Sequence, residues 1–276
     1  MPSLTIPGPE PVTLHYTDSG GAGRPVVLIH GWPLSGEAWA ANVPALVDAG
    51  YRVITYDRRG FGRSERPTSG YDYDTLAADL DALMTTLDLR DAVLVGFSMG
   101  GGEVARYIGT YGEDRLAGAV LAAAITPALE KSDDNPDGGM PREGFEGLRD
   151  QCAADRDGFV RQFLTWFFSN PSELTISKRQ FEDVLRIAAQ GSDQALQETI
   201  MIWGTDLRDD VAKITVPTLV IHGDSDNNVP FEPSGKRAAA AIPSARLHVV
   251  EGGPHGINTS HPDEFNRVLL DFLGSL

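Results

Sequence analysis

The alternation of two residue patterns along the chain constrains its fold most strongly. Short apolar runs rich in β-branched residues are typical of buried parallel strands, and they lie at 26–29, 53–56, 93–95, 119–121, 218–221 and 247–250. Between these runs, apolar residues recur at helical spacing, as in Leu76, Leu80 and Leu83 or in Phe265, Val268 and Leu269. This alternation predicts an α/β protein with a mostly parallel central sheet and helices on both faces.

The alternation is interrupted between residues 127 and 211. Gly and Pro punctuate residues 135–141, and a helical, aromatic-rich sequence follows. Because strand signals resume at Val216, we interpret the interval as a helical cap inserted into one sheet rather than as a linker between domains. We therefore expect a single domain over 1–276, with a core of 1–126 and 212–276 and a cap of about 127–211.

Charge and cysteine content exclude several classes of partner. The chain has 39 acidic against 23 basic residues, a formal charge of -16, which repels nucleic acid and anionic membrane surfaces. The single cysteine, Cys152, precludes an intramolecular disulfide and fits a reducing compartment. No secretory leader or bilayer-spanning apolar run is present in the sequence, so we expect a cytoplasmic protein that binds neither nucleic acid nor membranes.

The sharpest local motif is Gly96-Phe97-Ser98-Met99-Gly100, which directly follows a strand-like run and precedes a helix-like stretch. A serine hydroxyl attacks a carbonyl only if a base takes its proton and if the side chain projects from the backbone. A tight strand-to-helix turn with glycines at 96 and 100 provides that projection. A GxSxG string alone is also found in turns without a catalytic role, so Ser98 as nucleophile requires an acid and a base later in the chain.

Both partners follow in the expected order. The segment 222–230 supplies two carboxylates, Asp224 and Asp226, after a predicted strand, and His255 lies on a later Gly-rich loop. His255 is the predicted general base, oriented by a carboxylate on its other ring nitrogen. Spacing alone leaves the choice between the two aspartates open. The remaining histidines, His30 and His222 among them, are interpreted as structural or solvent-facing.

Two backbone N–H groups are needed to bind the negative oxygen that develops during acyl transfer. The residue after the nucleophile, Met99, is one candidate. The turn His30-Gly31-Trp32-Pro33, which follows the run 26–29, offers the N–H of Trp32 as the second. No cluster has metal-ligand spacing and no dinucleotide-binding string occurs, so we expect neither a metal nor another cofactor.

The chain resembles the cofactor-free haloperoxidases, also called non-haem chloroperoxidases or perhydrolases, and their relatives the aryl esterases and γ-lactamases. The matching strings are HGWP at 30–33, YDRRGFGRS at 56–64, VGFSMGGGEVARY at 95–107, TDLRDD at 205–210, HGDSDNNVP at 222–230 and PHG at 254–256. The resemblance covers nearly the whole chain and implies the α/β-hydrolase fold. It also implies that Asp226 is the triad acid and that Asp224 closes its loop.

For the substrate side, the resemblance implies an acyl pocket lined by the cap residues Phe163 and Phe167. It also implies that Pro33 belongs to the perhydrolase version of the oxyanion loop. Proline restricts Trp32 and can turn its carbonyl toward an incoming nucleophile, which would favour hydrogen peroxide over water. The alternative is that Pro33 only rigidifies a turn. The sequence departs from the family at 163–170, which is unusually bulky, and at 201–204.

The function implied is acyl transfer from a small ester or carboxylic acid through Ser98, without haem, flavin, vanadate or zinc. Water as acceptor gives an esterase, and hydrogen peroxide gives a peracid that oxidises halide. A lactonase or γ-lactamase using the same triad and a non-catalytic ligand receptor remain alternatives. Dehalogenase and epoxide hydrolase chemistry needs a carboxylate nucleophile in place of Ser98. Relatives commonly assemble, so a homo-oligomer is left open.

Overall fold

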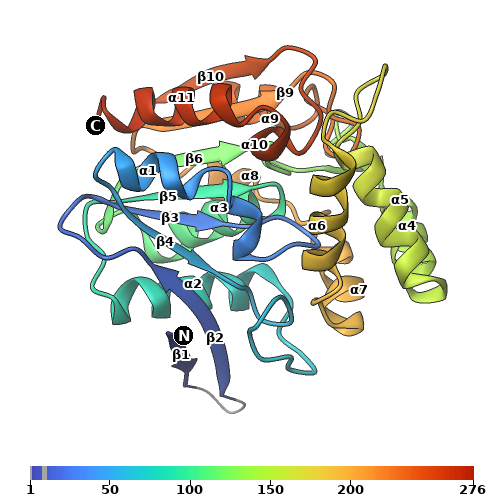
Figure 1. Cartoon of the computed structure of the whole chain (residues 1–276). Coiled ribbons are helices and arrows are strands. Elements are labelled where there is room, and N and C mark those ends of the chain that lie inside the picture. Colours follow the sequence, from blue (N-terminus) through green and yellow to red (C-terminus); the bar gives the residue numbers. More distant parts are fainter. Residues whose placement is uncertain (1, 8–10) are drawn as a thin grey trace.

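The computed structural model describes residues 2–7 and 11–276. In this part of the chain, eight strands form one sheet in the order β1-β2-β4-β3-β5-β6-β9-β10 (Figure 1). These strands are β1 (Ser3–Ile6), β2 (Val12–Asp18), β3 (Pro25–Ile29), β4 (Arg52–Tyr56), β5 (Ala92–Phe97), β6 (Leu116–Ala122), β9 (Thr218–Gly223) and β10 (Ala245–Val250). The fold is the predicted α/β class with a mostly parallel sheet.

The parallel strands of the sheet are predicted from the sequence, whereas the antiparallel strands are not. All six predicted runs lie in the parallel strands β3, β4, β5, β6, β9 and β10, which confirms those predictions. The strands β1 and β2 pair antiparallel at the sheet edge and are absent from the sequence prediction. Their residues are partly exposed and mix polar with apolar side chains, so no continuous apolar run marks them.

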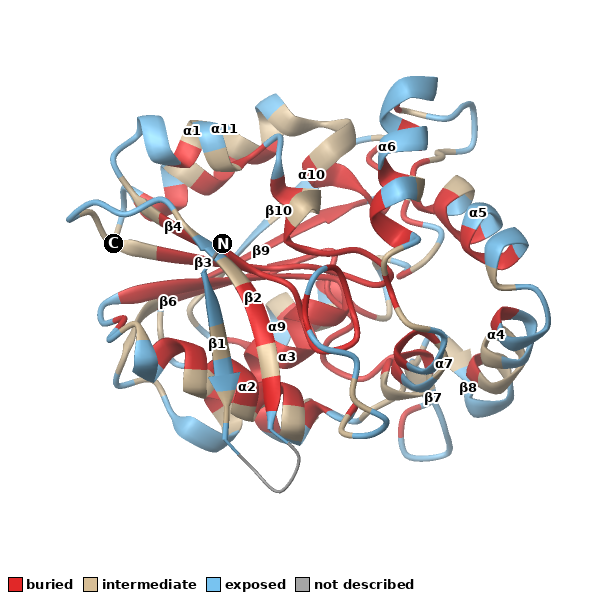
Figure 2. Ribbon diagram, turned by 60° about the horizontal axis from the view of Figure 1, so that its bottom comes forward, coloured by how far each residue is buried: buried red, intermediate tan, exposed pale blue. Residues whose placement is uncertain are grey.

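Helices cover both faces of the sheet (Figure 2). The helices are η1 (Gly36–Trp39), α1 (Val43–Asp48), α2 (Tyr73–Thr86), α3 (Met99–Tyr111), α4 (Arg142–Ala154), α5 (Arg156–Phe167), α6 (Lys178–Ala188), α7 (Asp193–Ile202), α8 (Arg208–Val211), α9 (Gly235–Ala241), α10 (Ile257–Ser260) and α11 (Pro262–Leu273). The helices α1 and α11 lie on one face, and α2, α3 and α9 lie on the other.

The core divides into two layers because successive side chains of a strand point to opposite faces. In β3, Val26 and Leu28 pack with Leu46 of α1 and Leu269 of α11. Their neighbours Val27 and Ile29 pack on the other face, with α2 and α3. The parallel strands are therefore buried on both sides, and only their ends carry loops that are free to hold polar side chains.

The segment between β6 and β9 contains most of the helices that extend beyond the sheet. It begins with two short paired strands, β7 (Glu130–Lys131) and β8 (Met140–Pro141), and continues through α4 to α8. In Figure 2, α4, α5, α6 and α7 stand together at one end of the sheet, beyond the carboxyl ends of the parallel strands. We refer to residues 127–211 as the cap. Several hydrogen bonds join it to the core. In one of them the indole N–H of Trp32 donates to the carbonyl of Leu196 in α7 at 3.1 Å.

Candidate active site

Ser98 occupies the sharp turn between β5 and α3. Its φ of 57° and ψ of −119° are unusual for a residue with a side chain, and such strain is concentrated at functional turns. The turn is packed closely against β3, since a Cβ on Gly100 would lie 2.6 Å from the Ile29 carbonyl oxygen. A Cβ on Gly96 would collide with the carbonyl of Gly100. Both glycines of the motif are thus required by the backbone, and Ser98 is held clear of the sheet.

His255 links Ser98 to a carboxylate. Its Nε2 lies 2.8 Å from Ser98 Oγ, and its Nδ1 lies 2.6 Å from Asp226 Oδ2. Because an ionised carboxylate can only accept, Nδ1 carries the proton and Nε2 is free to accept the serine proton. The three side chains come from the ends of β5, β9 and β10, and they form the geometry of a nucleophile activated by a general base.

Asp226 is buried, yet it is held as a carboxylate. Its Oδ1 accepts hydrogen bonds from the backbone N–H groups of Asn228 at 2.9 Å and Val229 at 2.8 Å. Its Oδ2 lies 3.2 Å from Nε2 of His222, a second fully buried histidine. Burial acts to raise the pKa of Asp226, but the imidazoles of His255 and His222 outweigh burial and hold this pKa at about 2. Asp226 therefore stays ionised throughout the neutral pH range.

His222 is a site residue that the sequence interpretation missed. The sequence pattern groups it with the structural or solvent-facing histidines, whereas the structure puts it against the oxygen of Asp226 that also bonds His255. The available signal is the four-residue spacing of His222 and Asp226 within HGDSD. The other carboxylate of that string, Asp224, is exposed and accepts the backbone N–H of Gly252 at 2.8 Å. It joins two loops and forms no hydrogen bond or ion pair with His255.

The two expected oxyanion donors lie beside Ser98. Met99 is the first residue of α3, so its N–H has no acceptor within the helix. Trp32 follows β3 in a loop that touches the nucleophile, because a Cβ on Gly31 would lie 3.0 Å from Ser98 Cβ. Within residues 2–7 and 11–276, neither N–H donates to a protein acceptor. Two buried, unpaired N–H groups next to a serine are the arrangement an oxyanion requires.

Ser98 and His255 open into a pocket with a volume of about 120 Å³. Its wall is made mainly of apolar and aromatic side chains, namely Trp32, Ile125, Leu129, Met140, Phe145, Leu148, Phe163, Trp166, Trp203 and Val229. Across the part of the chain that the structure describes, no carboxylate, lysine or arginine side chain lines this pocket. Such a pocket favours a small, uncharged acyl chain.

The cap residues expected in the pocket take different positions. Phe163 lines it and packs edge-to-face on Trp32, with ring centroids 4.7 Å apart. Phe167 is not part of the lining. It is fully buried, and its ring stands perpendicular to the imidazole of His255, with centroids 4.5 Å apart. The expectation for Phe167 is corrected because α5 directs Phe163 and Trp166 to the pocket and Phe167 to the base.

Two further aromatic residues lie close to the reacting atoms. Phe97, the second residue of the nucleophile motif, packs on His255 with ring centroids 5.2 Å apart. Trp203, at the position where the sequence departs from the family, lines the pocket and packs on Trp32 at 5.2 Å. Pro33 is buried and is not part of the pocket lining, and the Trp32–Pro33 peptide is cis.

In the described residues, no group of three or more His, Cys, Asp or Glu side chains is arranged to hold a metal ion. None of the helices in these residues has the length and apolar character needed to cross a bilayer.

Comparison with known proteins agrees with this geometry. The family model described as the alpha/beta hydrolase fold matches residues 24–262, so the chain belongs to the α/β-hydrolase family. Within it, the chain is 46% identical to the non-haem chloroperoxidase of Kitasatospora aureofaciens, over 95% of this chain and 96% of that protein. It is 37% identical to a bifunctional esterase/perhydrolase of Acinetobacter calcoaceticus, over 96% and 97%.

The same relationship is seen among solved structures. The crystal structure of a bromoperoxidase from Bacillus anthracis superimposes with a TM-score of 0.95, at 47% identity, and covers 99% of this chain and 100% of that one. The resemblance to the non-haem haloperoxidases and perhydrolases that the sequence strings indicated is confirmed.

Proposed function

We propose that this protein is a serine hydrolase that transfers small acyl groups from an ester or carboxylic acid to water or hydrogen peroxide. The observation that carries the proposal is the unbroken chain of contacts from Ser98 Oγ to His255, at 2.8 Å, and from His255 to Asp226, at 2.6 Å. His255 activates the nucleophile directly, so the reaction needs no metal ion or organic cofactor.

Acylation follows from the placement of these groups. Ser98 Oγ attacks the substrate carbonyl while His255 Nε2 takes the hydroxyl proton, and Asp226 stabilises the imidazolium that results. The carbonyl oxygen becomes negative and accepts hydrogen bonds from the N–H groups of Trp32 and Met99. Collapse of the tetrahedral intermediate breaks the bond to the leaving oxygen, which receives the proton from His255. An acyl group remains on Ser98.

Deacylation repeats these steps with a second nucleophile. His255 takes a proton from water or from hydrogen peroxide, and the resulting oxygen attacks the acyl carbon. Ser98 recovers its proton as it leaves. Water yields the carboxylic acid, and peroxide yields a peracid, which can then oxidise a halide ion in solution. Two names among the relatives, chloroperoxidase and bifunctional esterase/perhydrolase, match these two outcomes.

The acyl pocket and Pro33 define the specificity within this proposal. The pocket of about 120 Å³ and its aromatic wall suit acetyl-sized and slightly longer apolar acyl groups. Pro33 immediately follows Trp32, whose N–H is an oxyanion donor and whose carbonyl lies in the next peptide unit. By restricting this unit, Pro33 shifts the partition of the acyl-enzyme toward peroxide.

A paired assay tests the proposal. Purified protein treated with EDTA and dipicolinate should hydrolyse p-nitrophenyl acetate, and it should also form peracetic acid from acetate and hydrogen peroxide. A fluorophosphonate should label Ser98 and abolish both activities together. Loss of turnover on chelation that added metal restores would contradict direct activation by His255. Failure of the fluorophosphonate to label Ser98 would favour the alternative of a ligand receptor.

A further inference from the structure

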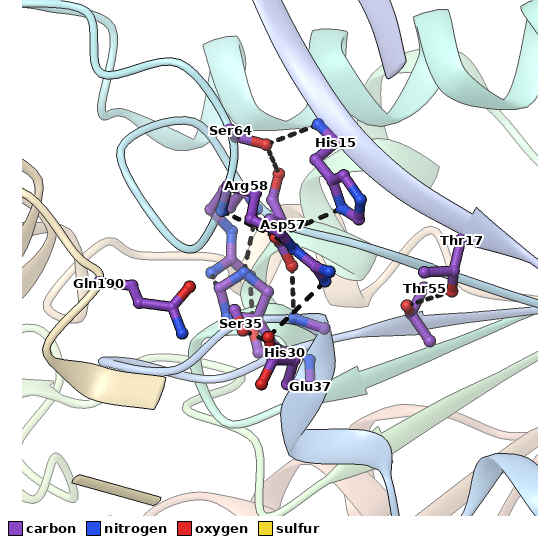
Figure 3. A network of polar contacts seen from close by, with 12 residues as sticks. His15, Thr17, His30, Ser35, Glu37, Thr55, Asp57, Arg58, Ser64 and Gln190 are labelled. Atoms are coloured by element: carbon purple, nitrogen blue, oxygen red, sulfur yellow. Dashed lines mark hydrogen bonds and ion pairs between the residues drawn. The ribbon is translucent and has the colours of Figure 1, made fainter. Parts of the chain in front are cut away.

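The oxyanion loop is anchored by a buried polar cluster that the mechanism above does not use. His30, directly after β3, contacts Arg58, which lies with Asp57 directly after β4, and Figure 3 draws these contacts. Both side chains are buried, with exposures of 1% for His30 and 0% for Arg58. Burial of an arginine is tolerated only where its charge is paired and its donors are satisfied, so the partners of Arg58 define its role.

The hydrogen bonds around His30 fix its ring in one tautomer. The backbone N–H of Arg58 donates to His30 Nε2 at 3.0 Å, so Nε2 carries no proton. Nδ1 must then hold the proton, and it lies 2.9 Å from the carbonyl oxygen of Gly31, to which it donates. Burial, reinforced by the positive charge of Arg58, holds the pKa of His30 well below its usual range, so the ring remains neutral.

The Gly31 carbonyl and the Trp32 N–H belong to the same peptide unit. In a planar trans peptide the C=O and N–H point in opposite directions, so holding one aims the other. The Gly31 oxygen accepts from His30 Nδ1 and also from the backbone N–H of Leu34, at 3.0 Å. With its carbonyl held at this end, the peptide presents the Trp32 N–H on the opposite side, toward Ser98.

Arg58 connects this loop to the helix that carries the other donor. Its guanidinium donates to the carbonyl of His30 at 2.6 Å and to Glu103 Oε2 at 2.7 Å. Glu103 lies in the first turns of α3, four residues after Met99, and its other oxygen accepts from the hydroxyl of Tyr56. One planar side chain with several donors therefore bonds both segments that supply oxyanion donors.

We propose that His30 and Arg58 are positioning residues for the oxyanion hole. His30 sets the direction of the Trp32 N–H, and Arg58 fixes the distance between the Trp32 loop and the start of α3. The inference rests on the proposed acyl-transfer function, because it assigns a supporting role to residues that touch neither substrate nor nucleophile.

Two variants test it in the full-length protein. His30→Phe keeps a flat ring but removes both nitrogens. The double variant Arg58→Met/Glu103→Gln removes both charges together, so no unpaired charge stays buried, and the new amide oxygen can still accept from Tyr56. The matched control is Arg59→Met/Asp79→Asn, because Arg59 and Asp79 form a neighbouring buried pair, at 2.6 and 2.7 Å, that joins α2 instead of the oxyanion segments.

The readouts are kcat per titrated active site, KM for p-nitrophenyl acetate, and the affinity for butylboronic acid, which forms a tetrahedral adduct on a reactive serine. We expect kcat to fall roughly 10- to 100-fold in both test variants, less than the loss typical of deleting a donor outright. KM should stay within about threefold, and boronate affinity should fall in parallel with kcat. The control should keep kcat and boronate affinity within about twofold even where its melting temperature falls.

The proposal would be overturned if both test variants kept the wild-type kcat per titrated site and only their melting temperatures fell. The cluster would then serve only to stabilise the fold. An equal loss in the control would overturn it as well. Failure of the proposed function is a different result, because it appears as a wild-type protein that does not hydrolyse esters. Boronate affinity is read by tryptophan fluorescence and needs no turnover, so the variants can be compared in that case also.

Discussion

The two halves of the active site are held together by different forces. On the catalytic side, each oxygen of Asp226 and each nitrogen of His255 has a directional partner at 2.6 to 3.2 Å. On the pocket side, Phe163 and Trp203 are held by ring packing on Trp32, and the buried indole N–H of Trp203 has no acceptor among the described residues. Hydrogen bonds set atomic positions narrowly, whereas packing tolerates exchanges that conserve volume. Substitutions on the catalytic side should therefore lower kcat, and substitutions on the pocket side should change substrate specificity.

The strongest test of this contrast is Ser98→Ala. Removing the nucleophile should lower kcat for p-nitrophenyl acetate by roughly 10⁴- to 10⁶-fold, and adding His255→Ala should lower it little further, because the two act as one unit. Steady-state rates at equal folded concentration provide the measurement. A residual rate within about 100-fold of the wild type would place the nucleophile elsewhere.

The two aspartates after β9 test the contrast at single-residue resolution. In Asp226→Asn the amide oxygen stays on the N–H groups of Asn228 and Val229, so an NH2 donor faces His255 Nδ1 and favours the wrong tautomer. The variant should lower kcat by about 10³- to 10⁴-fold. Asp224→Asn changes an exposed group that binds the Gly252 N–H and should change kcat by less than about threefold. Both rates should be compared at equal folded concentration. The reverse ranking of the two variants would show that Asp224 is the acid.

On the pocket side, Trp203→Phe should change which acyl group is preferred. The smaller ring enlarges the wall near Ser98, so the ratio of kcat/KM for p-nitrophenyl hexanoate to that for the acetate should rise roughly 10-fold. Trp39→Phe is the control, because Trp39 is also buried with an unpaired indole N–H but does not line the pocket. An equal change in both variants would mean that general loosening, and not pocket volume, sets the preference.

The smallest expected effect is that of Pro33→Leu. If the proline favours a hydrogen bond from peroxide to the Trp32 carbonyl, losing that bond is worth about 0.5 to 1.5 kcal/mol. The ratio of peracetic acid formation to ester hydrolysis should then fall by roughly 2- to 13-fold, while hydrolysis itself is kept or faster. Both reactions are measured on both proteins. A parallel fall in the two rates would indicate that Pro33 supports the oxyanion loop in general.

The sequence predicted those parts of the molecule that repeat a local pattern. The parallel strands appear as apolar runs because they are buried on both faces, and Ser98 and His255 follow from the order of motifs along the chain. The choice between Asp224 and Asp226 required the family resemblance, since both lie on one loop and only the tertiary structure decides which carboxylate meets His255.

Other contacts could not be predicted from the sequence because they join segments far apart in the chain. The position of Phe167 against His255 depends on how α5 is rotated over the loop after β10, which helical spacing does not determine. The link from Arg58 to Glu103 crosses 45 residues. Sequence patterns treat arginine and glutamate as surface residues, so they do not predict a buried charged pair of this kind.

The bond from the Trp32 indole to Leu196 has an evolutionary consequence. Its acceptor is a main-chain carbonyl, so any residue at position 196 offers the same anchor as long as α7 stays in place. Mutation can then remodel the side chains of the cap, and with them the shape of the pocket, while the loop that carries the Trp32 N–H keeps its attachment. Proteins that keep this bond can therefore acquire new substrates through substitutions in the cap while the catalytic residues stay unchanged.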